Sequence, residues 1–259
     1  MKIAVFGAGA YGATLGGILS EGGHEVEYYD PKMFQNSLDD VLNGASYMVL
    51  AIPSVAVHDF LPILPKDKTL IVATKGILTD SDFNDFSDWA VLSGPGFASD
   101  ISQHKETFLT ATDKRVAEIF DANYLIFDFT DDKLGVLMCG ALKNVYALMA
   151  GLLGIEAGSE PWEEYIKTVS NEMKSILSTN GADSKTVDLS CGIGDLRLTC
   201  NYPSRNYEFG QKLRLDKKAK PEKTVEGLTA LQKICNSEIL VPKDAKILQD
   251  LMDRSKEWS

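Results

Sequence analysis

The first half of the chain alternates short β-branched, apolar runs with stretches of helical spacing. Four runs are typical of strands buried on both faces, at residues 3–6, 26–29, 47–52 and 69–73. Helical patterns separate them at residues 10–21, 37–42 and 55–61. Further strands are predicted at residues 91–92, 108–111 and 125–127. Because strands that alternate with helices build βαβ units, the pattern predicts an α/β fold with a mostly parallel sheet.

Beyond residue 130 the pattern becomes helical only. Residues 133–153 form one long, mostly apolar helical stretch, and residues 161–179 form an amphipathic one with Pro161 near its start. Shorter helices are predicted at residues 186–189, 206–213, 224–236 and 242–254. We therefore predict two domains, an α/β domain at residues 1–130 and an all-helical domain at residues 131–259.

Composition narrows the class of protein. The chain has 259 residues, is 44 % apolar and carries a net charge of −11, which disfavours nucleic acid and anionic membranes as partners. No apolar stretch is expected to approach the ~20 residues of a membrane span. The N-terminal run leads directly into a glycine motif, so we interpret it as a strand and not a signal peptide. A cytoplasmic protein is expected, and the apolar helices of the second half are compatible with a homodimer.

Cysteines and histidines give no sign of a metal or disulfide framework. The four cysteines have no CxxC spacing and are expected to be reduced thiols, and the three histidines lie far apart. We therefore expect no metal site.

A glycine motif, GAGAYG at residues 7–12, follows the first predicted strand and opens a helix. Gly7 allows the tight turn, Gly9 lets a pyrophosphate approach the backbone, and Gly12 allows close packing of the helix. Unpaired N–H groups at the helix N-terminus would bind the pyrophosphate. Asp30 ends the second strand, where an acid accepts hydrogen bonds from the adenosine ribose. The order of these features predicts a Rossmann-type dinucleotide site that favours NAD over NADP, although the nearby Lys32 keeps NADP open.

Lys143 lies inside the long apolar stretch with no charged residue three or four positions away. A lysine is rarely buried without a partner, although a long side chain can also reach the surface from a core helix. The small residues Gly140, Ala147 and Gly151 leave room on that face of the helix. We expect a cleft there that holds substrate.

Three further segments carry candidate binding groups. Lys75 follows a buried strand, at the edge where ligands of open α/β sheets bind, although a surface lysine would show the same pattern. The loop SGPGFA at residues 93–98 offers backbone N–H groups to an anion or forms a plain tight turn. The cluster Ser204-Arg205-Asn206 combines a guanidinium with neutral donors on glycine-rich surroundings, which suits a phosphate.

Together these motifs closely resemble the bacterial, cytosolic NAD(P)-dependent sn-glycerol-3-phosphate dehydrogenases. The matches run in order along the chain: GAGAYG at 7–12, IPS at 52–54, TKG at 74–76, SGPGFA at 93–98, GALKNVYAL at 140–148, GIGDLRLTC at 192–200, SRN…FG at 204–210 and VEG at 225–227. The resemblance implies reversible hydride transfer between NAD(P)H and dihydroxyacetone phosphate, a small phosphorylated substrate, as a supply for phospholipid synthesis.

The resemblance also implies roles for single residues. Lys143 is implied as the general acid/base, with Lys75 and Asp195 as catalytic partners that orient the substrate. Substrate contacts are implied for Lys75, Gly94, Gly96, Lys143, Asn144, Asp195, Ser204, Arg205 and Asn206. Cofactor contacts are implied for Gly7, Gly9, Ala10, Tyr11, Gly12, Asp30, Ser54, Lys75, Ala98, Arg205 and Glu226. Because the glycine motif and Lys143 fall in different predicted domains, we expect the reaction to need both.

The chain departs from the family pattern at several positions. An insertion usual after Asp30 is missing, Gly96 stands where Ser or Thr is usual, His58 replaces a common Arg, and Glu208 falls in a normally basic stretch. These departures leave two alternatives open: a related two-domain reductase for another short hydroxy or keto acid, and a catalytically silent NAD(H)-binding sensor.

Overall fold

The structure is a computed structural model that describes residues 1–258, and its internal contacts divide the chain into two compact units. Unit 1 comprises Met1–Thr74 and Thr79–Lys133. Unit 2 comprises Lys75–Leu78 together with the described chain from Leu134 onward. The short segment Lys75–Leu78 thus follows a strand of unit 1 but packs with unit 2. The functional roles expected for residues 1–130 and 131–259 stay predictions.

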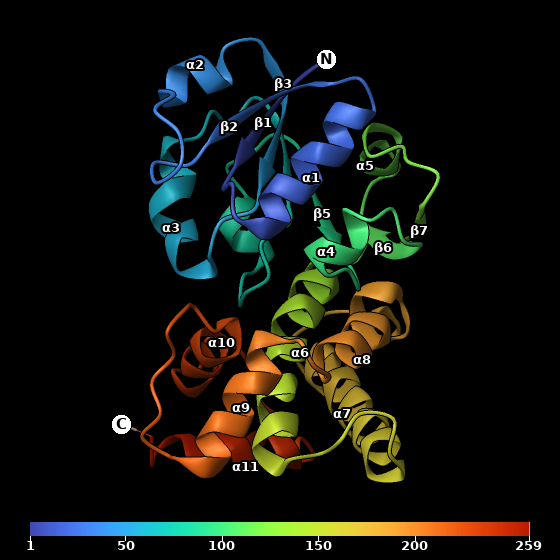
Figure 1. Ribbon diagram of the computed structural model, residues 1–259, viewed down its shortest axis with the longest axis vertical. Helices are drawn as coiled ribbons and strands as arrows, with labels where there is room; N and C mark the ends of the chain where they lie inside the picture. The colour runs from blue at the N-terminus through green and yellow to red at the C-terminus, as the bar shows by residue number, and fades with distance from the viewer. Residues whose placement is uncertain (259) are drawn as a thin grey trace. The chain divides into compact units, whose positions relative to one another are not determined.

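Unit 1 is built on one seven-stranded sheet with the order β2-β1-β3-β4-β5-β6-β7 (Figure 1). All neighbouring strands are parallel except β5 and β6. The strands are β1 (Lys2–Phe6), β2 (Glu25–Tyr29), β3 (Ala45–Leu50), β4 (Thr69–Val72), β5 (Trp89–Ser93), β6 (Thr107–Ala111) and β7 (Leu125–Phe129). The mostly parallel α/β fold expected from the sequence is confirmed. Strand order reverses at β1, between β2 and β3, and ligands of such sheets bind at that point.

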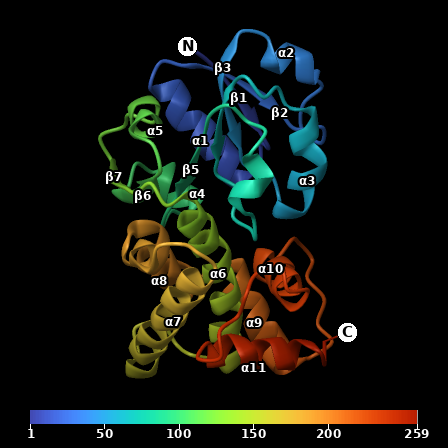
Figure 2. The ribbon, with the colours of Figure 1, turned by 180° about the vertical axis from the view of Figure 1, so that it is seen from behind.

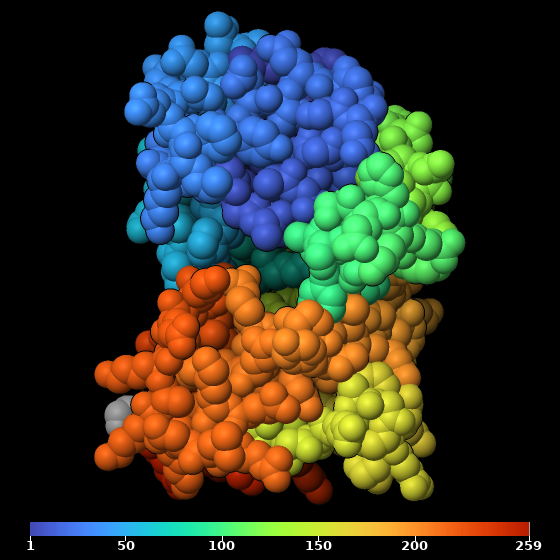
Figure 3. Space-filling model, in the orientation of Figure 1, coloured from blue at the N-terminus to red at the C-terminus, as the bar shows by residue number. Residues whose placement is uncertain are grey.

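Alternation along β1 sends neighbouring side chains to opposite faces of the sheet. Ile3 and Val5 join a core that α1 (Ala10–Glu21), α4 (Ala98–Ile101) and α5 (Lys114–Ile119) complete. Phe6 faces the other way and packs edge-on against Phe60, with ring centroids 5.1 Å apart. The surfaces of α1 (blue) and α4 (green) adjoin in Figure 3. The remaining helical segments are α2 (Leu38–Leu42), η1 (Ser54–Ala56), α3 (Val57–Phe60), η2 (Leu61–Ile63) and η3 (Asp80–Phe83).

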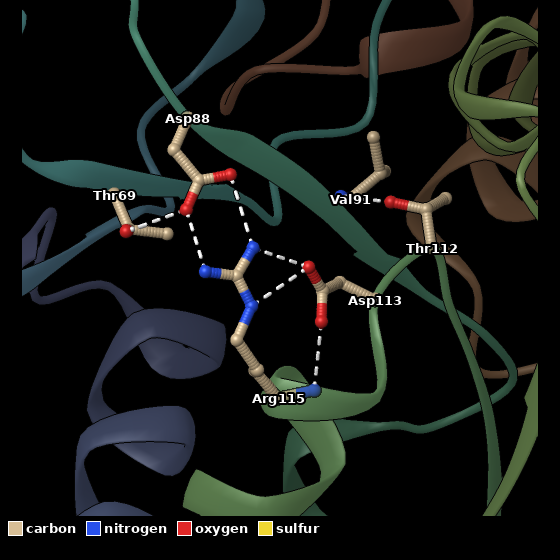
Figure 4. A network of polar contacts seen from close by, with 6 residues as sticks. All are labelled: Thr69, Asp88, Val91, Thr112, Asp113 and Arg115. Atoms are coloured by element: carbon tan, nitrogen blue, oxygen red, sulfur yellow. Dashed lines mark hydrogen bonds and ion pairs between the residues drawn. The ribbon is translucent and has the colours of Figure 1, made fainter.

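A charged network joins the start of β5 to the start of α5 (Figure 4). Arg115 donates to Asp88 at 2.7 Å and to Asp113 at 2.9 Å, and Thr69 also donates to Asp88 at 2.9 Å. The hydrogen bonds from Arg115 hold the pKa of both carboxyl groups below their usual range. This network ties β4, β5 and α5 together and contains no candidate site residue.

Unit 2 is helical, as the sequence predicts, and α6 (Lys133–Leu153) forms its centre (Figure 2). α7 (Glu160–Thr179) and α8 (Asp195–Thr199) lie on one side of α6, and α9 (Arg205–Leu215) and α10 (Glu226–Cys235) on the other. The unit also contains η4 (Ser184–Asp188), the π-helical turn η5 (Ser190–Gly194) and α11 (Lys246–Ser255). Two predicted helices differ: of residues 186–189, the first three belong to the 3₁₀ turn η4, which ends at Asp188, and the last helix begins at Lys246 and not at Pro242.

The expectation about membrane-length segments is wrong for α6. By length and composition, this 21-residue helix could cross a membrane, and it is the one such helix within residues 1–258. Most of its apolar window is buried inside the structure, which is the environment of a core helix. The helix also differs from a purely apolar one because it carries the buried, ionisable Lys143 near its middle.

Candidate active site

Asp195 enters the site from an unusual turn of backbone. It is the first residue of α8 and follows directly on the π-helical turn η5. A Cβ at Gly192 would overlap the carbonyl of Val187, so only glycine lets η5 pack this closely on η4. π-helical turns are rare and occur frequently at functional sites. The turn leaves the Asp195 side chain 1 % exposed.

Two lysines that are far apart in the sequence meet the two oxygens of Asp195. Lys143 Nζ donates to Oδ1 at 2.5 Å, and Lys75 Nζ donates to Oδ2 at 2.8 Å. Lys143 also donates to the hydroxyl of Thr199 at 2.9 Å. All four residues belong to unit 2. The structure thus brings together the three residues expected to be catalytic and adds a fourth polar group.

The surroundings of Lys143 favour its neutral form more than water does. Burial lowers the pKa of Lys143 to about 7, the Asp195 carboxylate opposes this shift, and the Lys75 ammonium adds to it. Burial by itself would raise the pKa of Asp195, but the two ammonium groups hold it below its usual value. Asp195 is therefore a carboxylate at neutral pH, and Lys143 is a group that can both give and take a proton.

The structure excludes one sequence interpretation of Lys143 and narrows the other. The side chain is 6 % exposed and does not reach the surface. The room beside Gly151 is filled by α9, because a Cβ at Gly151 would overlap the carbonyl of Tyr207. Gly210 makes the reciprocal approach to the carbonyl of Leu148. At Gly151 the small residue therefore serves close helix packing and not a substrate cleft.

Asn206 joins three helices through its side-chain amide. Its Nδ2 donates to Asn144 Oδ1 at 2.9 Å, and its Oδ1 accepts from the backbone N–H of Gly227 at 2.8 Å. Asn144 Nδ2 in turn donates to the carbonyl of Gly140 at 3.1 Å. Asn144 follows Lys143 on α6, so this chain of amides fixes the first turns of α9 and α10 beside Lys143. Glu226, an expected cofactor residue, is the first residue of α10.

Ser204 and Arg205 stand at the N-terminus of α9. Ser204 is the N-cap residue, yet its Oγ makes no capping bond, is buried and finds no hydrogen-bond partner among residues 1–258. Arg205 beside it is exposed. A helix N-terminus, a guanidinium and a hydroxyl without a partner together form a donor set that suits a phosphate. Glu208 lies in the first turn of α9, where an acid complements the helix dipole.

The glycine turn of unit 1 has the geometry expected for a dinucleotide site. Gly7 has φ +92°, which favours glycine, and a Cβ at Gly12 would overlap the carbonyl oxygen of Gly7. A Cβ at Gly9 would meet nothing within 4 Å, so the backbone there is open to a ligand. Ala10 and Tyr11 form the first turn of α1. These residues fit the pyrophosphate of NAD(P).

The carboxylate of Asp30 accepts hydrogen bonds from the backbone of the glycine turn and from the backbone just after β2. Its Oδ2 accepts from the N–H of Ala8 at 2.9 Å, and its Oδ1 accepts from the N–H of Lys32 at 3.0 Å. Each carboxylate oxygen keeps a second lone pair for a ribose hydroxyl. Ser54 is buried as the first residue of η1, which follows β3 after a short loop, and Ala98 begins α4.

Two loop glycines expected to contact substrate have packing reasons of their own. Gly94 has φ +152°, and a Cβ there would lie 2.7 Å from the carbonyl oxygen of Phe108. A Cβ at Gly96 would lie 2.7 Å from Ile101 Cδ1. Because Cδ1 is the movable end of the Ile101 side chain, this contact restricts position 96, where the family usually has Ser or Thr, less than the backbone contact restricts Gly94. His58, another departure, lies 3.5 Å from the Asp82 carboxylate.

Comparison with known proteins matches the helical half to the C-terminal region of NAD-dependent glycerol-3-phosphate dehydrogenase over residues 132–252. A glycerol-3-phosphate dehydrogenase [NAD(P)+] of Citrifermentans bemidjiense is 32 % identical over 81 % of this chain and 77 % of its own length. The chain belongs to the NAD(P)-dependent glycerol-3-phosphate dehydrogenase family. The relative from Lactobacillus helveticus is 31 % identical over 82 % of this chain and 78 % of its own length.

Solved structures agree in fold. The glycerol-3-phosphate dehydrogenase of Coxiella burnetii superposes with a TM-score of 0.81 at 22 % identity, covering 99 % of this chain and 97 % of that one. A ketopantoate reductase from Ralstonia eutropha reaches a TM-score of 0.58 at 18 % identity, covering 99 % of this chain and 100 % of that one. The two-domain fold with a Rossmann-type sheet and a helical second part is therefore shared with both enzymes, and more closely with the dehydrogenase.

Sequence reasoning missed one polar group of the site in this family member. Thr199 lies four residues after Asp195 on α8, so both side chains share a face of that helix. Its hydroxyl lies 3.3 Å from Asp195 Oδ1 and accepts from Lys143. The spacing Asp-x-x-x-Thr was visible in the sequence, but its meaning depends on Lys143 arriving from a different helix.

Proposed function

We propose that this chain reduces dihydroxyacetone phosphate to sn-glycerol 3-phosphate, reversibly, and that Lys143 is its general acid/base. The observation that carries the proposal is the buried Lys143 bound to Asp195, with Lys75 on the second oxygen of the same carboxylate. A reduced nicotinamide cofactor held at the glycine turn would supply the hydride. The open backbone at Gly9 and the donors of the first turn of α1 support its binding there.

Lys143 would move the proton that accompanies hydride transfer. As an ammonium, its Nζ donates to the substrate oxygen that gains negative charge, and it stabilises that charge before transfer. In the reverse direction the neutral amine takes the hydroxyl proton. A pKa near 7 makes both forms accessible at neutral pH. Asp195 keeps the ammonium oriented, and Lys75 limits how strongly the proton is held.

Ser204 and Arg205 would bind the phosphate of the substrate. The Ser204 hydroxyl without a partner supports this role, as does its place at the N-terminus of α9. Asn144 and Asn206, by contrast, already use much of their amide capacity on each other and on backbone groups. We assign them mainly to holding α6, α9 and α10 in register. The other expected contacts, at Gly94, Gly96, Ala98, Ser54 and Glu226, remain part of the proposal.

The deciding experiment measures NADH oxidation with and without dihydroxyacetone phosphate, repeated with NADPH. Turnover that depends on the phosphorylated ketone supports the proposal. Turnover only with another short keto acid would replace the substrate, and tight NADH binding without turnover on any candidate would indicate a sensor. Asp30 favours NADH, because a carboxylate repels a 2′-phosphate. A cytoplasmic location, a homodimer and a supply to phospholipid synthesis belong to the same proposal.

A further inference from the structure

The segment Lys75–Leu78 packs with unit 2, although the residues on both sides of it belong to unit 1. Just before it, the Thr74 hydroxyl donates to the carbonyls of Ile52 at 2.9 Å and Leu50 at 3.2 Å, where β3 and β4 of unit 1 end. The four residues that follow pack with unit 2. Ile77 is 3 % exposed and Leu78 is 2 % exposed. Lys75 therefore reaches Asp195 from a short connecting segment without regular secondary structure. Because no helix or strand fixes this backbone, other contacts must hold it in place.

Lys233 of α10 supplies such an anchor. Its Nζ donates to the carbonyl of Ile77 at 3.1 Å, two residues beyond Lys75. The Lys233 side chain is 15 % exposed and also lies 3.5 Å from Glu238. Charge-assisted hydrogen bonds are stronger than neutral ones. A mostly buried ammonium that donates to a backbone carbonyl therefore fixes the path of that backbone.

We propose that Lys233 is a positioning residue, which holds the Lys75 segment against α10 so that Lys75 meets Asp195. The proposal rests on the proposed function, because it concerns the geometry of the same site. Without the bond to Ile77, the backbone at Lys75 gains freedom and the Lys75 ammonium spends less time beside Asp195.

A looser Lys75 has a consequence that a general loss of stability does not. The charged groups that act on Lys143 are Asp195, whose carboxylate raises its pKa, and Lys75, whose ammonium lowers it. Two further neighbours of Lys143 carry no charge at neutral pH: the hydroxyl of Thr199, and the thiol of Cys200, whose pKa is raised by burial. When Lys75 withdraws, Asp195 acts on Lys143 with less opposition, so the pKa of Lys143 rises.

The kinetic test compares Lys233→Met with two matched variants. Lys233→Met keeps the aliphatic stem and removes the donor, and we expect kcat/KM to fall about tenfold, as for a lost charged hydrogen bond, with the pH profile of ketone reduction shifted to higher pH. Lys233→Arg keeps a donor and should restore most of the activity and the profile. Glu238→Gln removes the negative charge that lies 3.5 Å from Lys233 and should leave both unchanged. An unshifted profile in Lys233→Met, or an equal shift in Glu238→Gln, overturns the proposal.

A second measurement does not depend on activity. Amide hydrogen exchange of peptides that cover residues 75–79 should accelerate in Lys233→Met and stay at the wild-type rate in Glu238→Gln, with peptides of α6 as the reference for intact folding. Unchanged exchange at residues 75–79 overturns the positioning role even if the wild-type chain reduces no ketone. Accelerated exchange in a chain that lacks reductase activity supports the positioning role while the proposed function fails.

Discussion

Lys143 donates to Asp195 Oδ1 at 2.5 Å, and both side chains are almost completely buried. Removing a charged group from water costs roughly several kcal/mol. The attraction between two buried charges offsets this cost only when their geometry is good and further hydrogen bonds satisfy both groups. Here Lys75 and Thr199 supply those bonds. A buried pair of this kind is weak evidence for stability, so its purpose is better sought in proton transfer.

The rates of the forward and reverse reactions should respond to pH in opposite ways. Ketone reduction needs the Lys143 ammonium, and the pKa of Lys143 is about 7. The reduction rate should therefore be level below that pH and fall about tenfold per unit above it, whereas alcohol oxidation should rise over the same range. Initial rates in both directions between pH 5.5 and 9 with saturating cofactor, on the order of half-unit steps, test this. Parallel profiles in the two directions would contradict an acid/base at position 143.

Replacing the lysine itself should abolish turnover but spare cofactor binding. Lys143→Met removes the proton donor while its stem still fills the core, and general acid/base groups contribute roughly 10²–10⁴-fold to rate. Asp195 keeps Lys75 as a partner, so the chain should fold. Lys167→Met, at an exposed position of α7, is the matched control and should behave as wild type. Steady-state kinetics and NADH fluorescence titration measure the two quantities, and full turnover in Lys143→Met would refute the assigned role.

Loss of the guanidinium at the start of α9 should weaken substrate binding. Arg205→Ala removes a charge-assisted donor to the phosphate, and we expect KM for dihydroxyacetone phosphate to rise about 10–100-fold with a smaller change in kcat. Arg214→Ala, near the other end of the same helix, is the control with an unchanged KM. An unchanged KM in Arg205→Ala would contradict phosphate binding at the N-terminus of α9.

Two glycines of α1 and its N-cap form a matched pair for the cofactor. Neither Gly9 nor Gly17 would bring an added Cβ within 4 Å of another group. Gly9→Ala should raise the Kd for NADH, because the methyl group occupies the space where a pyrophosphate approaches the backbone. Gly17→Ala should leave the Kd unchanged and stabilise the helix by roughly 0.5–1 kcal/mol. Calorimetric titration with NADH and thermal melting separate the two effects, and equal NADH affinity in both variants would place the cofactor elsewhere.

Local patterns were sufficient for most of the fold. Period and composition predicted α6 with its bounds, since twenty-one residues of one helical pattern leave little ambiguity. The parallel order followed from alternating strands and helices. Short elements such as α4, α5 and α8 were not predicted, because four to six residues carry too little periodicity to distinguish a helix from a turn.

The sequence by itself determined which residue types could do the chemistry: a glycine turn after a strand, an uncharged face around Lys143, and a Ser-Arg-Asn cluster. Only the tertiary structure decided that Lys75 and Lys143 share the two oxygens of Asp195, that Thr199 joins them, and that the small residue at Gly151 admits a helix and not a substrate. The physical reason is distance along the chain. Backbone preferences act over a few residues, whereas a carboxylate that meets lysines 120 and 52 positions away depends on how whole helices pack.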